Sequence, residues 1–144
     1  MTRIKNKRQL AASKTWLSEF RRALRAARKN PVHLPPRLLK AELAGIRSQI
    51  QALEREIEEY EALVKASPKE VVLTSLKDLP DTLVRMRIVR GLTQEQLAEK
   101  LNIKPQQIQR WEAGAYRSAT FKRMLQVANA LQFDIPEVFL SDCS

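Results

Sequence analysis

Cysteine and histidine are scarce in this sequence, and their scarcity narrows the range of possible sites. The 144 residues include one cysteine, one histidine and three glycines. The lone Cys143 excludes an internal disulfide and a cysteine zinc site, and we interpret it as an incidental thiol of the tail. His33, between Pro31 and Pro35, has no partner for metal or triad chemistry in the sequence pattern, so we assign it to a loop.

Catalytic motifs and long apolar runs are also missing. There is no phosphate-cradling glycine loop, no HExxH and no GxSxG pattern. We therefore expect neither an enzyme nor a bound cofactor or metal. No run of 18 apolar residues occurs, and charges interrupt the amino-terminal segment, so neither a transmembrane helix nor a signal peptide is expected. These features predict a cytoplasmic protein without membrane association.

Positive charge, by contrast, is abundant and unevenly distributed. The formal net charge is +10 at pH 7. Residues 1–37 carry eleven Lys and Arg against Glu19 alone, whereas residues 38–66 carry four basic and six acidic residues. The basic excess therefore forms an amino-terminal arm.

Apolar residues recur at helical spacing almost everywhere, which predicts an all-α protein. A first helix is expected over residues 7–29, ended by Pro31, and a second over residues 36–65. The stretch from Glu70 to Leu76 is the one place where a strand or an extended linker is expected.

The second expected helix has the most regular apolar pattern, with heptad positions a and d filled throughout, as in a coiled-coil seam. Two arrangements are open. Two copies can pair antiparallel as a homodimer, or the first helix can fold back on the second through residues 30–36, and both together would give a four-helix dimer. The eight seam residues are Leu39, Leu43, Ile46, Ile50, Leu53, Ile57, Tyr60 and Val64.

From Asp78 onward the sequence predicts a series of short helices. Asp78 can cap the first of them, and Gly91 supplies the left-handed residue that ends it. Thr93 and Gln96 form a capping box at the start of the second helix, which continues to Leu101.

A tight turn is expected between this helix and the next. Asn102 accepts a positive φ, and Lys104 before Pro105 is biased toward the extended conformation of a capping residue. The third helix therefore starts at Pro105. Its inner face carries Ile108 and Trp111, which leaves an outer polar set of Gln106, Gln107, Gln109 and Arg110.

The outer set consists of side chains that can read bases, although a solvated polar face has the same composition. Gln pairs with adenine N6 and N7, and Arg pairs with guanine O6 and N7. Residues 79–135 resemble the Cro/C1-type (XRE) helix-turn-helix family. The positions that match are Arg87, Gly91, Leu92, Thr93, Gln94, Leu97, Ala98, Ile108, Glu112 and Gly114.

The resemblance implies a five-helix, lambda-repressor-like domain whose helix from Pro105 enters the major groove of double-stranded DNA. It further implies a phosphate contact at Gln94, base readers at Gln106, Gln107 and Arg110, and a partly buried ion pair between Arg87 and Glu112. Residues after Gly114 can also reach phosphates. The predicted DNA-binding residues are Gln94, Lys104, Gln106, Gln107, Gln109, Arg110, Tyr116, Arg117 and Ser118.

We therefore expect a helical hairpin over residues 1–66, a linker over 67–78 and a helix-turn-helix domain over 79–144. The expected function is that of a transcriptional regulator, most simply a dimeric repressor. The alternative is an antitoxin that binds a toxin and its own promoter, because the opening Ile4–Gln9 and the segment Ile57–Glu61 resemble antitoxins of the HigA kind.

Overall fold

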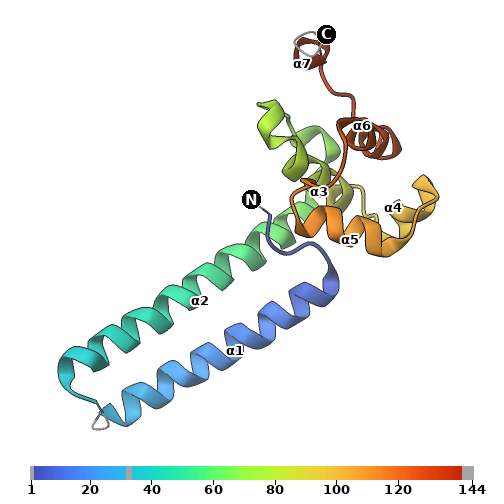
Figure 1. Cartoon of the computed structure of the whole chain (residues 1–144). Coiled ribbons are helices and arrows are strands. Elements are labelled where there is room, and N and C mark those ends of the chain that lie inside the picture. Colours follow the sequence, from blue (N-terminus) through green and yellow to red (C-terminus); the bar gives the residue numbers. More distant parts are fainter. Residues whose placement is uncertain (1, 32–33, 141–144) are drawn as a thin grey trace. The chain divides into compact units, whose positions relative to one another are not determined.

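The computed structural model describes residues 2–31 and 34–140, and within them every regular element is a helix (Figure 1). The predicted all-α class is confirmed. His33 and Cys143 lie outside the described residues. None of the described helices has the length and apolar character needed to span a bilayer. The elements are α1 (Lys7–Lys29), α2 (Pro36–Lys65), η2 (Pro68–Glu70), η3 (Leu76–Asp78), α3 (Leu79–Val89), α4 (Gln94–Leu101), α5 (Pro105–Ala113), α6 (Phe121–Ala130) and α7 (Glu137–Leu140).

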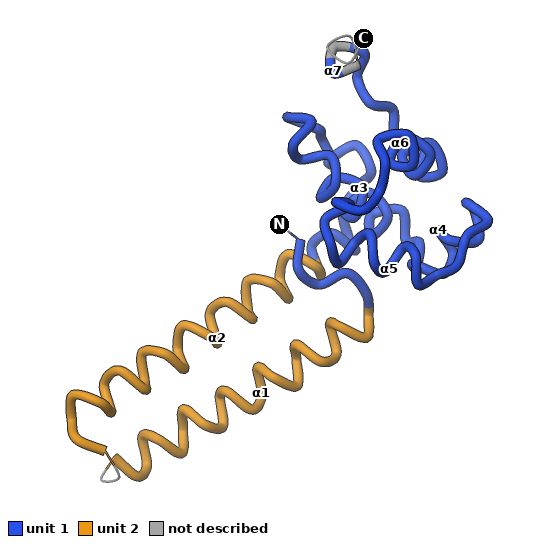
Figure 2. The backbone as a smooth tube through the Cα atoms, in the orientation of Figure 1, with its two compact units in different colours: residues 1–6, 62–144 blue, residues 7–61 orange. Residues whose placement is uncertain are grey.

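The chain divides into two compact units (Figure 2). Residues 7–61 form the hairpin unit, and residues 1–6 together with 62–144 form the globular unit. These boundaries differ from the expected ones, because the expected linker 67–78 is part of the globular unit. Its Val71 and Leu73 are buried while Val72 is 64% exposed. Residues 71–75, between η2 and η3, therefore lie outside any helix and pack on one side, and they pair with no strand among the described residues.

In the hairpin unit, α1 and α2 run antiparallel and pair within one chain (Figure 1). Lys14 and Glu61 form an ion pair at 2.7 Å, and Arg21 and Glu54 form another at 2.9 Å. Both pairs are about half exposed, so each contributes at most about 1 kcal/mol. The buried apolar residues contribute more, and they come from both helices: Leu17, Ala27, Ile50, Ile57 and Tyr60.

One predicted seam position differs from the structure. Val64 is 55% exposed, whereas its neighbour Leu63 is buried. The reason is that α2 leaves the hairpin unit after Glu61, so its last turn packs within the globular unit instead. The rest of the seam is buried or half-buried.

The caps of the globular unit are the predicted ones at three of four places. Thr93 and Gln96 form a complete capping box at the start of α4. Gly91 has φ of 70°, and Asn102 adopts the left-handed conformation with φ of 54°. Asp78 occupies the expected N-cap position of α3, but its side chain makes no capping hydrogen bond: a 3-10 turn precedes α3, and the carboxylate accepts from the Thr74 hydroxyl at 3.0 Å instead.

The core of the globular unit lies between α3, α4, α5 and α6, which contribute Leu83, Leu97, Ile108 and Val127, each 0% exposed. These contacts fix α5 against α4 across the turn at Asn102. The predicted helix-turn-helix geometry follows from that packing, since the outer side of α5 faces away from the core.

Candidate nucleic-acid interface

Helix α5 presents the predicted polar face to solvent. Ile108 and Trp111 are buried, at 0% and 4% exposure. Gln107 is half-buried and borders an open groove. The residues of α5 that are exposed are Gln106, Gln109 and Arg110. Lys104 caps α5 in the extended conformation without a side-chain hydrogen bond, as expected, so its ammonium remains at the surface.

A buried ion pair holds α5 to α3. The Arg87 Nε donates to Glu112 Oε2 at 2.7 Å, and its Nη2 donates to Glu112 Oε1 at 2.7 Å. Both side chains are buried, at 3% and 0% exposure. Arg87 Nη1 also donates to the Leu92 carbonyl at 2.8 Å. The bidentate geometry fixes the rotation of α5 about its own axis, and with it the direction of the outer residues.

The side chain of Gln94, which was expected to contact a phosphate, instead binds other side chains of the protein. Gln94 is only 4% exposed. Its Nε2 donates to Glu112 Oε1 at 2.9 Å, and its Oε1 accepts from Asn6 Nδ2 at 3.1 Å. Both polar ends of the side chain are thus occupied, and Gln94 is a member of the Arg87–Glu112 network.

Asn6, which donates to Gln94, comes from the amino-terminal segment of the chain. Residues 2–6, which we call the docked arm, pack on the globular unit with Ile4 at 3% exposure. The Thr2 amide donates to Asp81 Oδ1 at 2.7 Å, and the Lys5 carbonyl accepts from Arg87 Nη2 at 2.5 Å.

The ammonium of Lys5 belongs to the same arm. Lys5 Nζ donates to the Thr2 carbonyl at 2.7 Å. Partial burial lowers the pKa of Lys5, a shift that the carboxylates of Glu112 and Asp81 oppose. The sequence analysis used this segment as part of a basic arm and of the resemblance to antitoxins, and did not predict that it packs on the globular unit. The apolar Ile4 within it was the one available signal of packing.

Tyr116 is a second correction. Predicted to reach a phosphate, it is 2% exposed and packs against Trp111 with ring centroids 5.9 Å apart. Burial raises the pKa of its phenol above the ordinary tyrosine value. The neighbouring Arg117 and Ser118 are exposed, and their contact with a phosphate stays a prediction.

An open groove of about 500 Å³ runs beside α5. Lys104, the N-cap residue of α5, and Gln107 of α5 line one side of it, and Ser118 and Arg123 line it from the following loop and α6. Two cations and three polar side chains, those of Gln107, Ser118 and Thr120, line this one concavity, which suits a phosphate lying alongside the helix.

Comparison with known proteins agrees with this geometry. Residues 83–138 match the family model HTH_3, described as Helix-turn-helix. No curated protein and no solved structure matches the chain. The match covers less than half of the chain; together with the exposed polar face of α5 it supports a DNA-binding transcription regulator that carries a helix-turn-helix.

Proposed function

We propose that the protein is a sequence-specific transcriptional repressor that reads the major groove with α5. The observation that carries the proposal is the division of α5 into two faces: the buried Ile108, Trp111 and Glu112 hold the helix, while Gln106, Gln109 and Arg110 project outward. Glutamine and arginine are the side chains that make bidentate pairs with adenine and guanine. Lys104, Arg117 and Ser118 flank this face and supply contacts to the phosphate backbone of DNA.

Selection from a pool of random duplexes tests the proposal directly. The protein should enrich one short sequence, and Gln106→Ala should weaken that enrichment without changing the melting temperature, because the exposed Gln106 is not part of the core. Lys65→Ala, on the exposed end of α2, is the control and should leave the selected sequence unchanged. Recovery of no preferred sequence by the unmodified protein would contradict the proposal.

We further propose a homodimer joined through the hairpin unit. When α1 and α2 pair only with each other, part of the apolar surface of each helix stays exposed. Trp16 and Leu38 are 58% and 54% exposed. A second copy would cover them and supply a second recognition helix for a half-site about one helical turn away. Trp16→Gln combined with Leu38→Gln should therefore yield monomers in sedimentation. An unmodified protein that is already monomeric at about 50 µM contradicts this assembly.

An antitoxin is the second candidate function. It is favoured by the separation of the hairpin unit from the DNA-binding unit, since an antitoxin needs one surface for the toxin and another for its promoter. Coexpression with the product of a neighbouring small reading frame distinguishes the two candidates. A stable complex, together with suppression of the growth defect that this product causes, supports the antitoxin. Separate elution of the two proteins from a size-exclusion column supports the stand-alone repressor.

A further inference from the structure

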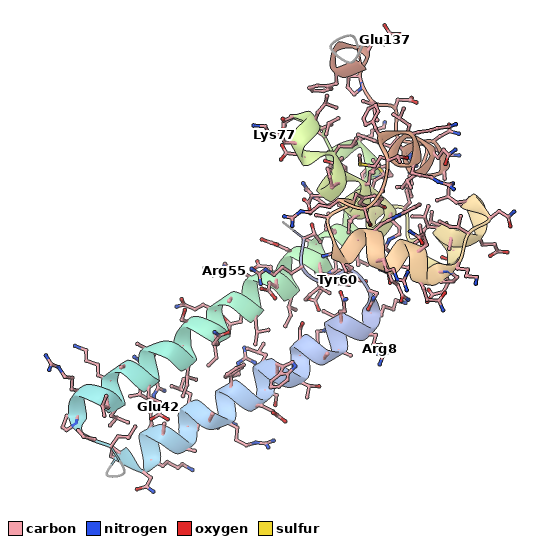
Figure 3. The ribbon with its side chains drawn as sticks, in the orientation of Figure 1. Arg8, Glu42, Arg55, Tyr60, Lys77 and Glu137 are labelled. Atoms are coloured by element: carbon pink, nitrogen blue, oxygen red, sulfur yellow. The ribbon has the colours of Figure 1, made fainter. Side chains whose placement is uncertain are left out.

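Charge is segregated along the hairpin unit. We define the distal hairpin as residues 21–47, the half that includes the connection between α1 and α2. All of its eight basic residues are exposed. Glu42, which Figure 3 labels on α2, is its only acidic residue. Residues 48–61 carry the opposite balance, with five acidic residues against Arg55. The basic residues of the distal hairpin are Arg21, Arg22, Arg25, Arg28, Lys29, Arg37, Lys40 and Arg47.

The ion pairs of the hairpin leave most of this charge uncompensated. Glu61 forms an ion pair with Lys14, and Glu54 forms one with Arg21. The two pairs are seven residues apart on each helix, so one further step of the same register sets Arg28 against Arg47. Within the residues that the structure describes, the seven distal cations other than Arg21 form no ion pair. Like charges in such proximity repel each other, and a bound polyanion relieves that repulsion.

Three of the cations share one face of α1. Arg22, Arg25 and Lys29 follow each other at spacings of three and four residues, which places them in a row along the helix. The row points away from the buried Ala27. Such a row of cations can neutralise neighbouring phosphates of a duplex, which carries one negative charge per about 1.7 Å of axis.

We propose that the distal hairpin binds the phosphate backbone of DNA as a second, sequence-independent contact besides α5. The inference rests on the proposed DNA-binding function, because a duplex held by α5 is present at high local concentration around the same chain. Six of the eight cations are arginines, whose planar guanidinium groups hold phosphate oxygens bidentately. A protein partner would need apolar anchors, and among the described residues of the distal hairpin only Leu38 is a large apolar side chain that is strongly exposed.

Two matched variants of the full chain test the proposal. The distal variant carries Arg22→Gln, Arg25→Gln and Lys29→Gln; the control carries Arg55→Gln, Lys65→Gln and Lys69→Gln, all exposed and outside the distal hairpin. Both lose three positive charges, and glutamine retains helix propensity, which circular dichroism checks. Fluorescence anisotropy with a 40-base-pair random duplex, titrated with salt, measures the affinity and the number of phosphate contacts.

The distal variant should bind the random duplex about 10- to 100-fold more weakly, with a salt slope reduced by about 1 to 3. The control should differ from the unmodified protein by less than about 3-fold. Equal behaviour of the two variants overturns the inference, and so does tighter binding of poly-L-aspartate than of the duplex. If the distal variant loses affinity but the unmodified protein prefers no sequence, the inference holds and the proposed function fails. If sequence preference is present and the distal variant keeps its salt slope, only the inference fails.

Discussion

Replacement of Glu112 by alanine should lower the free energy of unfolding of the globular unit by about 3 to 5 kcal/mol. Arg87 and Glu112 are 3% and 0% exposed, so solvent does not screen their interaction. Without the carboxylate, the Arg87 Nε loses its acceptor at 2.7 Å, and the guanidinium remains buried beside the Lys5 and Leu92 carbonyls alone. Gln94 Nε2 loses its acceptor as well.

The loss is large for a unit of this size. At about 4 °C or more per kcal/mol, Glu112→Ala should melt at least about 12 °C lower than the unmodified protein. The two tryptophans lie in different units, so Trp16→Phe provides a background in which fluorescence reports on the buried Trp111 and hence on the globular unit alone.

A second substitution separates the buried charge from the lost packing. In the Arg87→Met, Glu112→Leu variant no charge stays buried and unpaired, so this protein should be more stable than Glu112→Ala alone. Its recovery should be partial, because the Lys5 and Leu92 carbonyls lose their donor. A loss below about 1 kcal/mol for Glu112→Ala, or a double variant less stable than the single one, would refute the view that this ion pair holds α5 in place.

Four further substitutions probe the other contacts. Tyr116→Phe removes a buried hydroxyl that has no partner among the described residues, and should be neutral or stabilising by about 1 kcal/mol at pH 7. Because burial raises the pKa of this phenol, the unmodified protein should lose stability as the pH rises above about 10, where only the unfolded chain ionises; urea unfolding should show a smaller loss for the variant. Asn6→Ala should cost about 1 kcal/mol in thermal unfolding by leaving the Gln94 carbonyl oxygen without its donor, and an unchanged stability would mean that the arm does not dock. Arg110→Ala should relax preference at one base pair and spare binding to random duplex, whereas Arg117→Ala should lower the salt slope by about one on every duplex; equal losses on both duplexes for Arg110→Ala would make it a backbone contact.

Local chemistry explains what the sequence predicted correctly. Gly91 and Asn102 adopt positive φ, and Thr93 caps α4 through the predicted box, because each of these features is decided within four residues. The inward positions of Ile108 and Trp111 follow from helical spacing alone. The orientation of α5, and with it most of the candidate readout face, was therefore predictable.

The failures concern contacts between distant parts of the chain. Asn6 and Gln94 are 88 residues apart in sequence, and no local pattern around either residue predicts their contact. Tyr116 has a polar group at its tip and an apolar ring, and only the position of Trp111 decides that it is buried. Asp78 is a good capping residue by type, but the preceding 3-10 turn gives its carboxylate another partner.

The docking of residues 2–6 makes the hairpin unit an insertion within the globular unit, and chain entropy then couples the two. With the hairpin open, the contact between Asn6 and Gln94 closes a loop of 88 residues. Once Lys14 pairs with Glu61, the free chain in that loop is about halved, which lowers the entropic cost of closure by about 0.6 kcal/mol. A ligand or a second copy that stabilises the hairpin would therefore favour docking of the arm against Gln94. The effect acts through chain connectivity alone and needs no contact between the ligand and the globular unit.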